Sequence, residues 1–172
     1  MIAGSGTAPG VSIGPLVNEA AINKVDNQVK DAVKKGATLV TGGFRILENN
    51  LDKGHFYAPT ILDNVTDEML VYREETFGPV APIIRYEDEE LLLKMANDTD
   101  YGLAAYVYTQ NLSNAMKLFE GLNFGIIGIN DINPTSASAP FGGMKESGIG
   151  REGALEGIEE YLETKLGGFS LR

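Results

Sequence analysis

The sequence predicts an α/β fold with a mainly parallel sheet and flanking helices. From residue 79 to residue 130, apolar runs and amphipathic segments alternate in the order strand, helix, strand, helix, strand. This order implies right-handed crossovers between parallel strands. The 172 residues are 43% hydrophobic, which is enough for one sizeable core and indicates one domain or part of one.

The first predicted helix follows Asn18, whose side chain can cap it, and ends at Gly36, which tolerates a left-handed conformation. Its apolar positions recur at spacings of three and four: Ile22, Val25, Val29 and Val33. Residues 38–41 then have the character of a strand. Residues 56–62 predict an edge or irregular strand, because Pro59 cannot donate a hydrogen bond to a ladder. Residues 79–86 predict another such strand.

The second half begins with a helix from Asp88, followed by a strand at residues 104–109. A helix at residues 112–122 and a buried strand at residues 126–130 repeat this alternation. A last helix is expected at residues 153–163, with three apolar side chains buried: Leu155, Ile158 and Leu162.

A long loop without periodicity, residues 131–150, follows the end of the last predicted parallel strand. Compact domains rarely keep a loop of this length unless it has a function. Open α/β sheets bind their ligands beyond the carboxyl ends of parallel strands. The loop is therefore a candidate ligand site.

Charge and composition disfavour several classes of partner. The net charge is −10, so we expect the surface to repel nucleic acid and anionic membranes. No apolar run is long enough for a membrane-spanning helix, and no basic segment followed by an apolar one marks an export signal. The chain contains no cysteine, which makes a cytoplasmic location the simplest expectation.

Two common kinds of site are also disfavoured. The glycine spacing of residues 148–153 matches a dinucleotide-binding fingerprint, but no predicted strand precedes it. His55 is the only histidine and has no partners at metal-ligand spacing, so neither a metal site nor a Ser-His-Asp triad is expected.

Three ordered segments carry a family resemblance: Glu-Glu-Thr-Phe-Gly-Pro at 74–79, Asn-Asp-Thr-Asp-Tyr-Gly-Leu-Ala-Ala at 97–105, and Pro-Phe-Gly-Gly-Met-Lys-Glu-Ser-Gly at 140–148. Taken singly, the first could be a solvated acidic turn and the last a tight connection. Together with Ile-Gly-Pro-Leu at 13–16, they resemble aldehyde dehydrogenases. Residues 150–165 are most similar to succinate-semialdehyde dehydrogenases, although related semialdehyde enzymes share parts of this segment.

The resemblance implies oxidation of an aldehyde to a carboxylic acid with NAD or NADP. In the family a cysteine thiolate attacks the carbonyl, hydride passes to the cofactor, and a glutamate activates the hydrolytic water. Both residues precede the segment that resembles 13–16, so no catalytic residue is expected in this chain. We therefore expect the chain by itself to be inactive.

The resemblance also assigns binding residues. Glu75 matches the glutamate that accepts hydrogen bonds from the nicotinamide-ribose hydroxyls, and Phe77 matches the aromatic residue on the nicotinamide side of the cofactor. Phe141 matches an aromatic residue lining the aldehyde pocket. Thr135 and Ser136 are the candidates for a hydroxyl that binds the distal carboxylate of succinate semialdehyde.

Residues 1–164 are expected to form the C-terminal part of the catalytic domain, and residues 165–172 a strand that joins a neighbouring subunit in a homo-oligomer. The alternative for this tail is a frayed terminus. For the whole chain the alternatives are a truncated, non-enzymatic assembly or binding module and a dehydrogenase for another semialdehyde.

Overall fold

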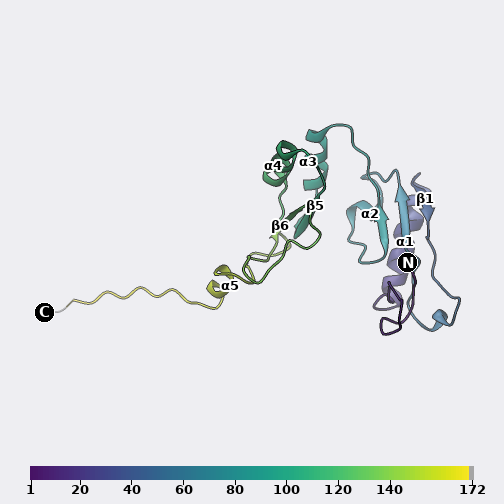
Figure 1. Cartoon of the computed structure of the whole chain (residues 1–172), viewed down its shortest axis with the longest axis horizontal. Coiled ribbons are helices and arrows are strands. Elements are labelled where there is room, and N and C mark those ends of the chain that lie inside the picture. The colour runs from purple at the N-terminus through teal and green to yellow at the C-terminus, as the bar shows by residue number, and fades with distance from the viewer. Residues whose placement is uncertain (171–172) are drawn as a thin grey trace. The chain divides into compact units, whose positions relative to one another are not determined.

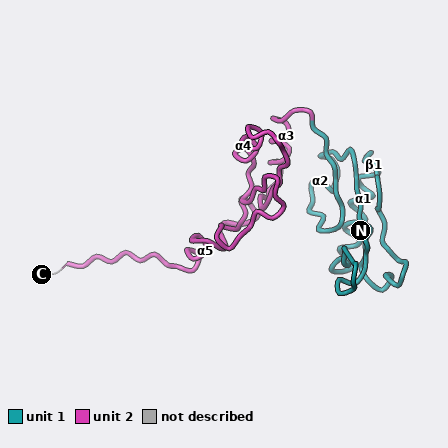
Figure 2. Tube along the Cα trace, in the orientation of Figure 1, with its two compact units in different colours: residues 1–86 teal, residues 87–172 magenta. Residues whose placement is uncertain are grey.

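The computed structural model describes residues 1–170. Its Cα trace divides into two compact units, one formed by residues 1–86 and the other beginning at residue 87 (Figure 2). Each unit combines short strands with helices, so the α/β class expected from the sequence is confirmed (Figure 1). Within residues 1–170, no helix has the length and apolar character needed to cross a bilayer.

The first unit is built on helix α1, Glu19–Lys34. Asn18 caps the helix, because its Oδ1 accepts a hydrogen bond of 2.9 Å from the backbone N–H of Ala21. Gly36, with a φ of +103°, follows its C-terminus. Three of the predicted apolar positions are buried: Ile22, Val25 and Val29. The fourth, Val33, is 43% exposed, and Ala32 is the buried residue in the last turn.

Three strands form the sheet of this unit in the order β1 (Thr38–Thr41), β2 (Thr60–Asp63), β3 (Val80–Pro82). The first pair is antiparallel and the second is parallel. β1 has its predicted bounds. The strand predicted at 56–62 begins only at Thr60, because Pro59 has no N–H to donate and Tyr57 forms only an isolated bridge with Arg45.

The core of the first unit lies between α1 and residues 57–71. It contains, besides the buried face of α1, Tyr57, Leu62, Val65, Met69 and Val71. Val71 belongs to α2 (Leu70–Arg73), a single turn too short to show an apolar period in the sequence. Asp31 of α1 accepts a hydrogen bond of 2.8 Å from the backbone N–H of Leu70, and this bond and Lys35 hold the pKa of the Asp31 carboxyl below its usual value. A short 3-10 helix, η1 (Leu51–Lys53), completes the unit.

The second unit contains one of the two predicted strand–helix–strand crossovers. The other is wrong, because β3 belongs to the three-stranded sheet of the first unit and pairs with β2. β5 (Ala104–Val107) pairs in parallel with β6 (Ile126–Ile129), and α4 (Leu112–Gly121) connects them (Figure 1). α3 (Glu89–Asn97), capped by Asp88, packs on α4: a Cβ at Gly121 would lie 2.9 Å from the Leu93 side chain. β4 (Tyr101–Gly102) and β7 (Met144–Lys145) form an antiparallel pair that the sequence did not predict.

The C-terminal part differs from its prediction. The helix expected at residues 153–163 is the single turn α5 (Glu156–Glu159). The expected burial of its apolar side chains is wrong within this chain, where the exposed fractions of Leu155, Ile158 and Leu162 are 71%, 59% and 67%. Leu166 and Phe169 are 97% and 93% exposed. No strand forms at residues 165–170, and residues 171–172 of the predicted tail strand lie outside the described residues, so pairing with another subunit stays a prediction.

Candidate functional site

Glu75 and Phe77 lie in a turn of the first unit, residues 74–78, that connects α2 to β3. Both side chains are exposed, Phe77 by 81%. Phe77 has a φ of +49°, an uncommon left-handed conformation for a non-glycine residue, and such strain occurs often at ligand sites. An ionised carboxylate accepts hydrogen bonds from hydroxyl groups, and an exposed aromatic ring offers an apolar surface to a flat ligand. The turn can therefore bind a ligand that has hydroxyl groups beside a ring.

The 74–78 turn is anchored to α1. A Cβ at Gly78 would lie 2.6 Å from Cγ2 of Val25, so only glycine permits this approach without a shift. Gln28 Nε2 donates a hydrogen bond of 3.3 Å to Glu74 Oε2. At the start of the turn, the backbone N–H of Glu74 donates to the carbonyl of Leu70 over 2.8 Å. The exposed side chains thus extend from a backbone that is held on its inner side.

In the second unit, two hydrogen bonds hold Asn130, the residue that precedes the 131–150 loop. Asn130 has a φ of +54°, accepts a hydrogen bond of 3.0 Å from the Thr109 N–H and donates one of 2.8 Å to the Thr109 carbonyl. Beyond it, Thr135 Oγ1 donates to Asn133 Oδ1 over 3.0 Å. Ser136 Oγ lies 3.0 Å from Ser138 Oγ. The two candidate hydroxyls are therefore exposed and held only by neighbours in the loop.

The structure brings Thr135 and Phe141 to one small cavity of about 170 Å³. Pro134, Ile126 and Ile127 are also among its lining residues, and Ser136 is not. Phe141 is 39% exposed, and its backbone is paired in both directions with Glu152 by hydrogen bonds of 2.7 Å. A hydroxyl and an aromatic ring thus border the same space, as a pocket for a small polar aldehyde requires.

Glycines and one arginine determine the path of the loop around Phe141. Arg151 Nη1 donates hydrogen bonds of 2.8 Å to the carbonyls of both Gly143 and Gly150. A Cβ at Gly142 would lie 2.6 Å from the Gly150 carbonyl oxygen, so the two backbone segments touch. Sequence reasoning assigned Arg151 no role, although an arginine in a glycine-dense segment is a signal that guanidinium–carbonyl contacts are possible.

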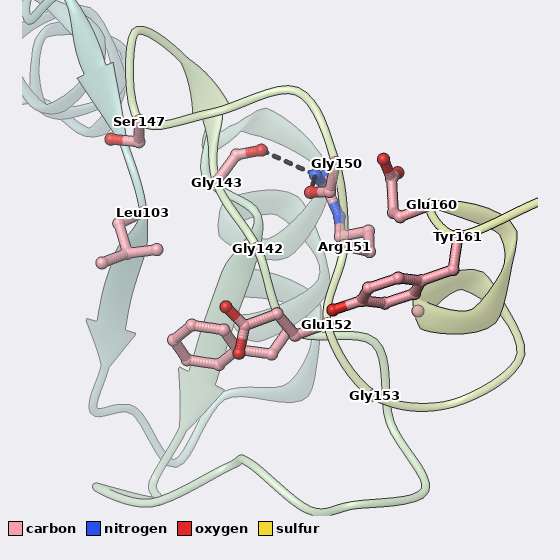
Figure 3. A pocket seen from close by; sticks show the side chains of 12 residues that line it. Leu103, Gly142, Gly143, Ser147, Gly150, Arg151, Glu152, Gly153, Glu160 and Tyr161 are labelled. Atoms are coloured by element: carbon pink, nitrogen blue, oxygen red, sulfur yellow. Dashed lines mark hydrogen bonds between the residues drawn. The ribbon is translucent and has the colours of Figure 1, made fainter.

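A larger cavity of about 540 Å³ lies beside this crossing (Figure 3). Its side-chain lining combines Leu103, Phe141, Ser147, Arg151, Glu152, Glu160 and Tyr161, and glycines make up the rest. Figure 3 shows Arg151 between the Gly143 backbone and the side chains of Glu160 and Tyr161. Ser147 Oγ also accepts a hydrogen bond of 3.0 Å from the Gly102 N–H, which anchors the loop to β4.

The described residues contain no group of three or more histidine, cysteine, aspartate or glutamate side chains that could hold a metal ion. His55 has a different contact: its Nδ1 lies 3.3 Å from Glu19 Oε2. The other carboxylate oxygen of Glu19 pairs with Arg45 Nη1 over 2.7 Å. The single histidine therefore lies beside the Glu19–Arg45 ion pair, which joins the start of α1 to residues 45–55.

Comparison with known proteins identifies the family. The model of the aldehyde dehydrogenase family matches residues 1–166, and the chain belongs to this family. The mitochondrial succinate-semialdehyde dehydrogenase of Rattus norvegicus is 49% identical over 162 residues, which are 94% of this chain and 30% of that protein. The chain thus spans about a third of the length of the relatives it matches. The family expected from the ordered sequence segments is confirmed.

Solved structures agree with this membership. An E. coli NADP-dependent enzyme is 47% identical, with a TM-score of 0.89 over 95% of this chain and 33% of that one. The betaine aldehyde dehydrogenase of Staphylococcus aureus in complex with NAD⁺ is 38% identical, with a TM-score of 0.89 over the same shares of the two chains, 95% and 33%. Both cofactors therefore occur among proteins similar to this chain.

Proposed function

We propose that this chain is part of an NAD- or NADP-dependent aldehyde dehydrogenase that oxidises succinate semialdehyde to the carboxylic acid. The observation that carries this proposal is the 49% identity to a succinate-semialdehyde dehydrogenase over 94% of the chain. The S. aureus relative, which is named for another aldehyde, is less similar at 38%. The runner-up is a dehydrogenase for a different semialdehyde, because a relative named for another aldehyde also matches over 95% of this chain.

In this proposal the 74–78 turn binds the nicotinamide end of the cofactor, which accepts hydride when bound. Glu75 accepts hydrogen bonds from ribose hydroxyls, and each such charge-assisted bond contributes about 1.5–3 kcal/mol. Phe77 packs its exposed ring on the nicotinamide side. The exposure of both side chains and the left-handed backbone at Phe77 support this assignment.

The 131–150 loop binds the aldehyde. Phe141 packs on its carbon chain, and the Thr135 hydroxyl donates a hydrogen bond to the distal carboxylate. Ser136 is a second donor if the loop rearranges when substrate binds. The cavity that Thr135 and Phe141 share favours Thr135 over Ser136 as the donor to the carboxylate.

The nucleophile must come from elsewhere in the protein, because this chain contains no cysteine. We therefore propose that the chain by itself does not oxidise aldehydes. We also propose that the protein is a homo-oligomer assembled through residues 165–172, beyond a catalytic part formed by residues 1–164. A cytoplasmic location stays a prediction, since the rat relative is named as mitochondrial.

A substrate comparison on the full-length protein tests the proposal. We expect kcat/KM for succinate semialdehyde to exceed that for betaine aldehyde and for longer semialdehydes by at least about tenfold, which corresponds to about 1.4 kcal/mol of transition-state binding. Each substrate is measured with NAD and with NADP. A higher kcat/KM for another semialdehyde would support the runner-up, and no oxidation of any aldehyde would support the non-enzymatic module.

A further inference from the structure

Gln28 is a fully buried amide in α1, whose other buried residues are all apolar: Ile22, Val25, Val29 and Ala32. Its exposed fraction is 0%, and its Oε1 has no hydrogen-bond partner among the described residues. Its Nε2 donates a hydrogen bond of 3.3 Å to Glu74 Oε2. Because an ionised carboxylate only accepts hydrogen bonds, the group facing Glu74 must be the amide nitrogen. A buried amide with an unsatisfied oxygen is costly, so an apolar side chain of the same size would serve stability better.

The contact joins the middle of α1 to the residue that precedes Glu75. Val25, one helical turn before Gln28, touches the other end of the turn at Gly78. Both ends of the 74–78 turn therefore rest on α1, while Glu75 and Phe77 between them extend into solvent. The strained backbone of Phe77 persists only if surrounding contacts impose it.

Two further polar contacts extend the same face of α1. Asp31 accepts the hydrogen bond from the Leu70 N–H over 2.8 Å, and Lys35 Nζ donates to the Glu68 carbonyl over 2.7 Å. Gln28, Asp31 and Lys35 are spaced by three and four residues, so they lie on one side of the helix. This polar row holds residues 68–74, and Gln28 is the member whose partner, Glu74, belongs to the turn.

We propose that Gln28 is a positioning residue for hydride transfer: its amide holds Glu74 and thereby sets where Glu75 and Phe77 meet the nicotinamide. The inference rests on the proposed cofactor role of the turn. It explains why a buried polar group is kept where an apolar one would pack. Small displacements of orienting groups slow a reaction strongly even when binding changes little.

The test uses Gln28→Met in the full-length protein, because methionine keeps the side-chain length but cannot donate. We expect single-turnover hydride transfer to slow by about 3–10-fold, with KM for the aldehyde unchanged. An aldehyde deuterated at the carbonyl carbon should show a larger isotope effect on kcat than in the unsubstituted protein. Tm should stay equal or rise, since the unsatisfied oxygen is removed. An unchanged hydride-transfer rate overturns the inference.

Tyr57→Phe is the matched control. The Tyr57 hydroxyl donates a hydrogen bond of 3.3 Å to Asp26, which lies in α1 like Gln28. The variant therefore also removes a hydrogen bond to α1, but one that does not reach the 74–78 turn. We expect its hydride-transfer rate to equal that of the unsubstituted protein. A slowing equal to that of Gln28→Met would mean that any loosening of α1 suffices, and would overturn the specific role of Gln28.

A double-mutant cycle with Glu74 tests the route. Glu74→Ala should slow hydride transfer as much as Gln28→Met, and the double variant should be no slower than either, because both remove one contact. If the double variant were slower by the product of the two single fold-changes, the inference would be overturned. Glu75→Gln in the same assay distinguishes a failure of the proposed cofactor role of the turn from a failure of the inference about Gln28. If Glu75→Gln leaves the rate of hydride transfer unchanged, the proposed role of the turn is wrong, and so is the inference. If Glu75→Gln slows hydride transfer while Gln28→Met does not, only the inference is wrong.

Discussion

The 74–78 turn and the 131–150 loop are held by different kinds of contact. The turn is anchored by long-range contacts from α1, where Gln28 reaches Glu74 and Val25 touches Gly78. The loop residues with the two candidate hydroxyls, in contrast, are held by exposed hydrogen bonds between near neighbours, such as Thr135 to Asn133. Farther along, the loop is tied to a distant strand, because the Gly102 N–H donates a hydrogen bond to Ser147 Oγ, while Arg151 binds the carbonyl of nearby Gly143.

This difference matches the tasks we propose for the two regions. Partly buried contacts between distant residues restrict the backbone geometry, as orientation of a cofactor ring requires. Exposed local contacts are easily exchanged, and they leave a loop free to vary with the ligand it binds. The cofactor region should therefore respond to substitutions mainly through the rate of hydride transfer, and the substrate region mainly through KM.

The largest expected effect comes from presenting both regions without the rest of the protein. The purified 172-residue chain should form no reduced cofactor above the uncatalysed background with succinate semialdehyde, because it has no cysteine to attack the carbonyl. Absorbance of the reduced cofactor measures this, with the full-length protein as the positive control. Turnover by the chain would show that binding regions alone suffice.

Glu75→Gln in the full-length protein should lower kcat by about 10- to 100-fold, as expected for loss of a charge-assisted hydrogen bond worth about 1.5–3 kcal/mol. The cofactor Kd should change less, because most binding contacts lie outside the turn. Pre-steady-state kinetics and cofactor titration measure the two quantities. Glu48→Gln, at another exposed carboxylate of the first unit, is the control and should behave like the unsubstituted protein.

Arg151→Lys should raise KM for the aldehyde by about 3–10-fold, since a lysine cannot reproduce the guanidinium contacts to Gly143 and Gly150. Hydride transfer at saturating aldehyde should change less than in Glu75→Gln. Arg85→Lys, at an exposed arginine paired with Asp63 in the first unit, is the matched control. A fall in hydride transfer without a rise in KM would contradict the division between the two regions.

Thr135→Val should raise KM for succinate semialdehyde by about 3–10-fold, because it removes one hydrogen bond to the substrate carboxylate while keeping the side-chain shape. KM for an uncharged aldehyde of similar length should stay the same. Ser136→Ala serves as the comparison and should change KM by less than about twofold, since Ser136 does not line the cavity. The reverse ranking would assign the hydroxyl to Ser136.

The last prediction leaves both regions intact. Deleting residues 165–172 from the full-length protein should shift the assembly toward monomer, because an apolar tail strand would no longer add to a neighbouring sheet. Size-exclusion chromatography with light scattering measures the mass. An oligomer of unchanged mass would identify the tail as a terminus without an assembly role.

The sequence by itself determined the elements whose signals are local. The Asn18 cap, the period of α1 and the parallel pair β5–β6 all follow from residue type and spacing within one segment, and the structure confirms them. The three ordered family segments also need no structure, since their order alone identifies the family that the comparisons confirm. Such features depend on helix geometry or chain order, which a linear pattern records.

Only the tertiary structure decided which distant residues support these segments. The β4–β7 pair, the hydrogen bond from Gln28 to Glu74 and the contacts of Arg151 join residues that no local period relates. A buried glutamine in a helix has the same local signal as an exposed one. Its role depends on what packs against it, and that is fixed by the folding of the whole unit rather than by its neighbours in sequence.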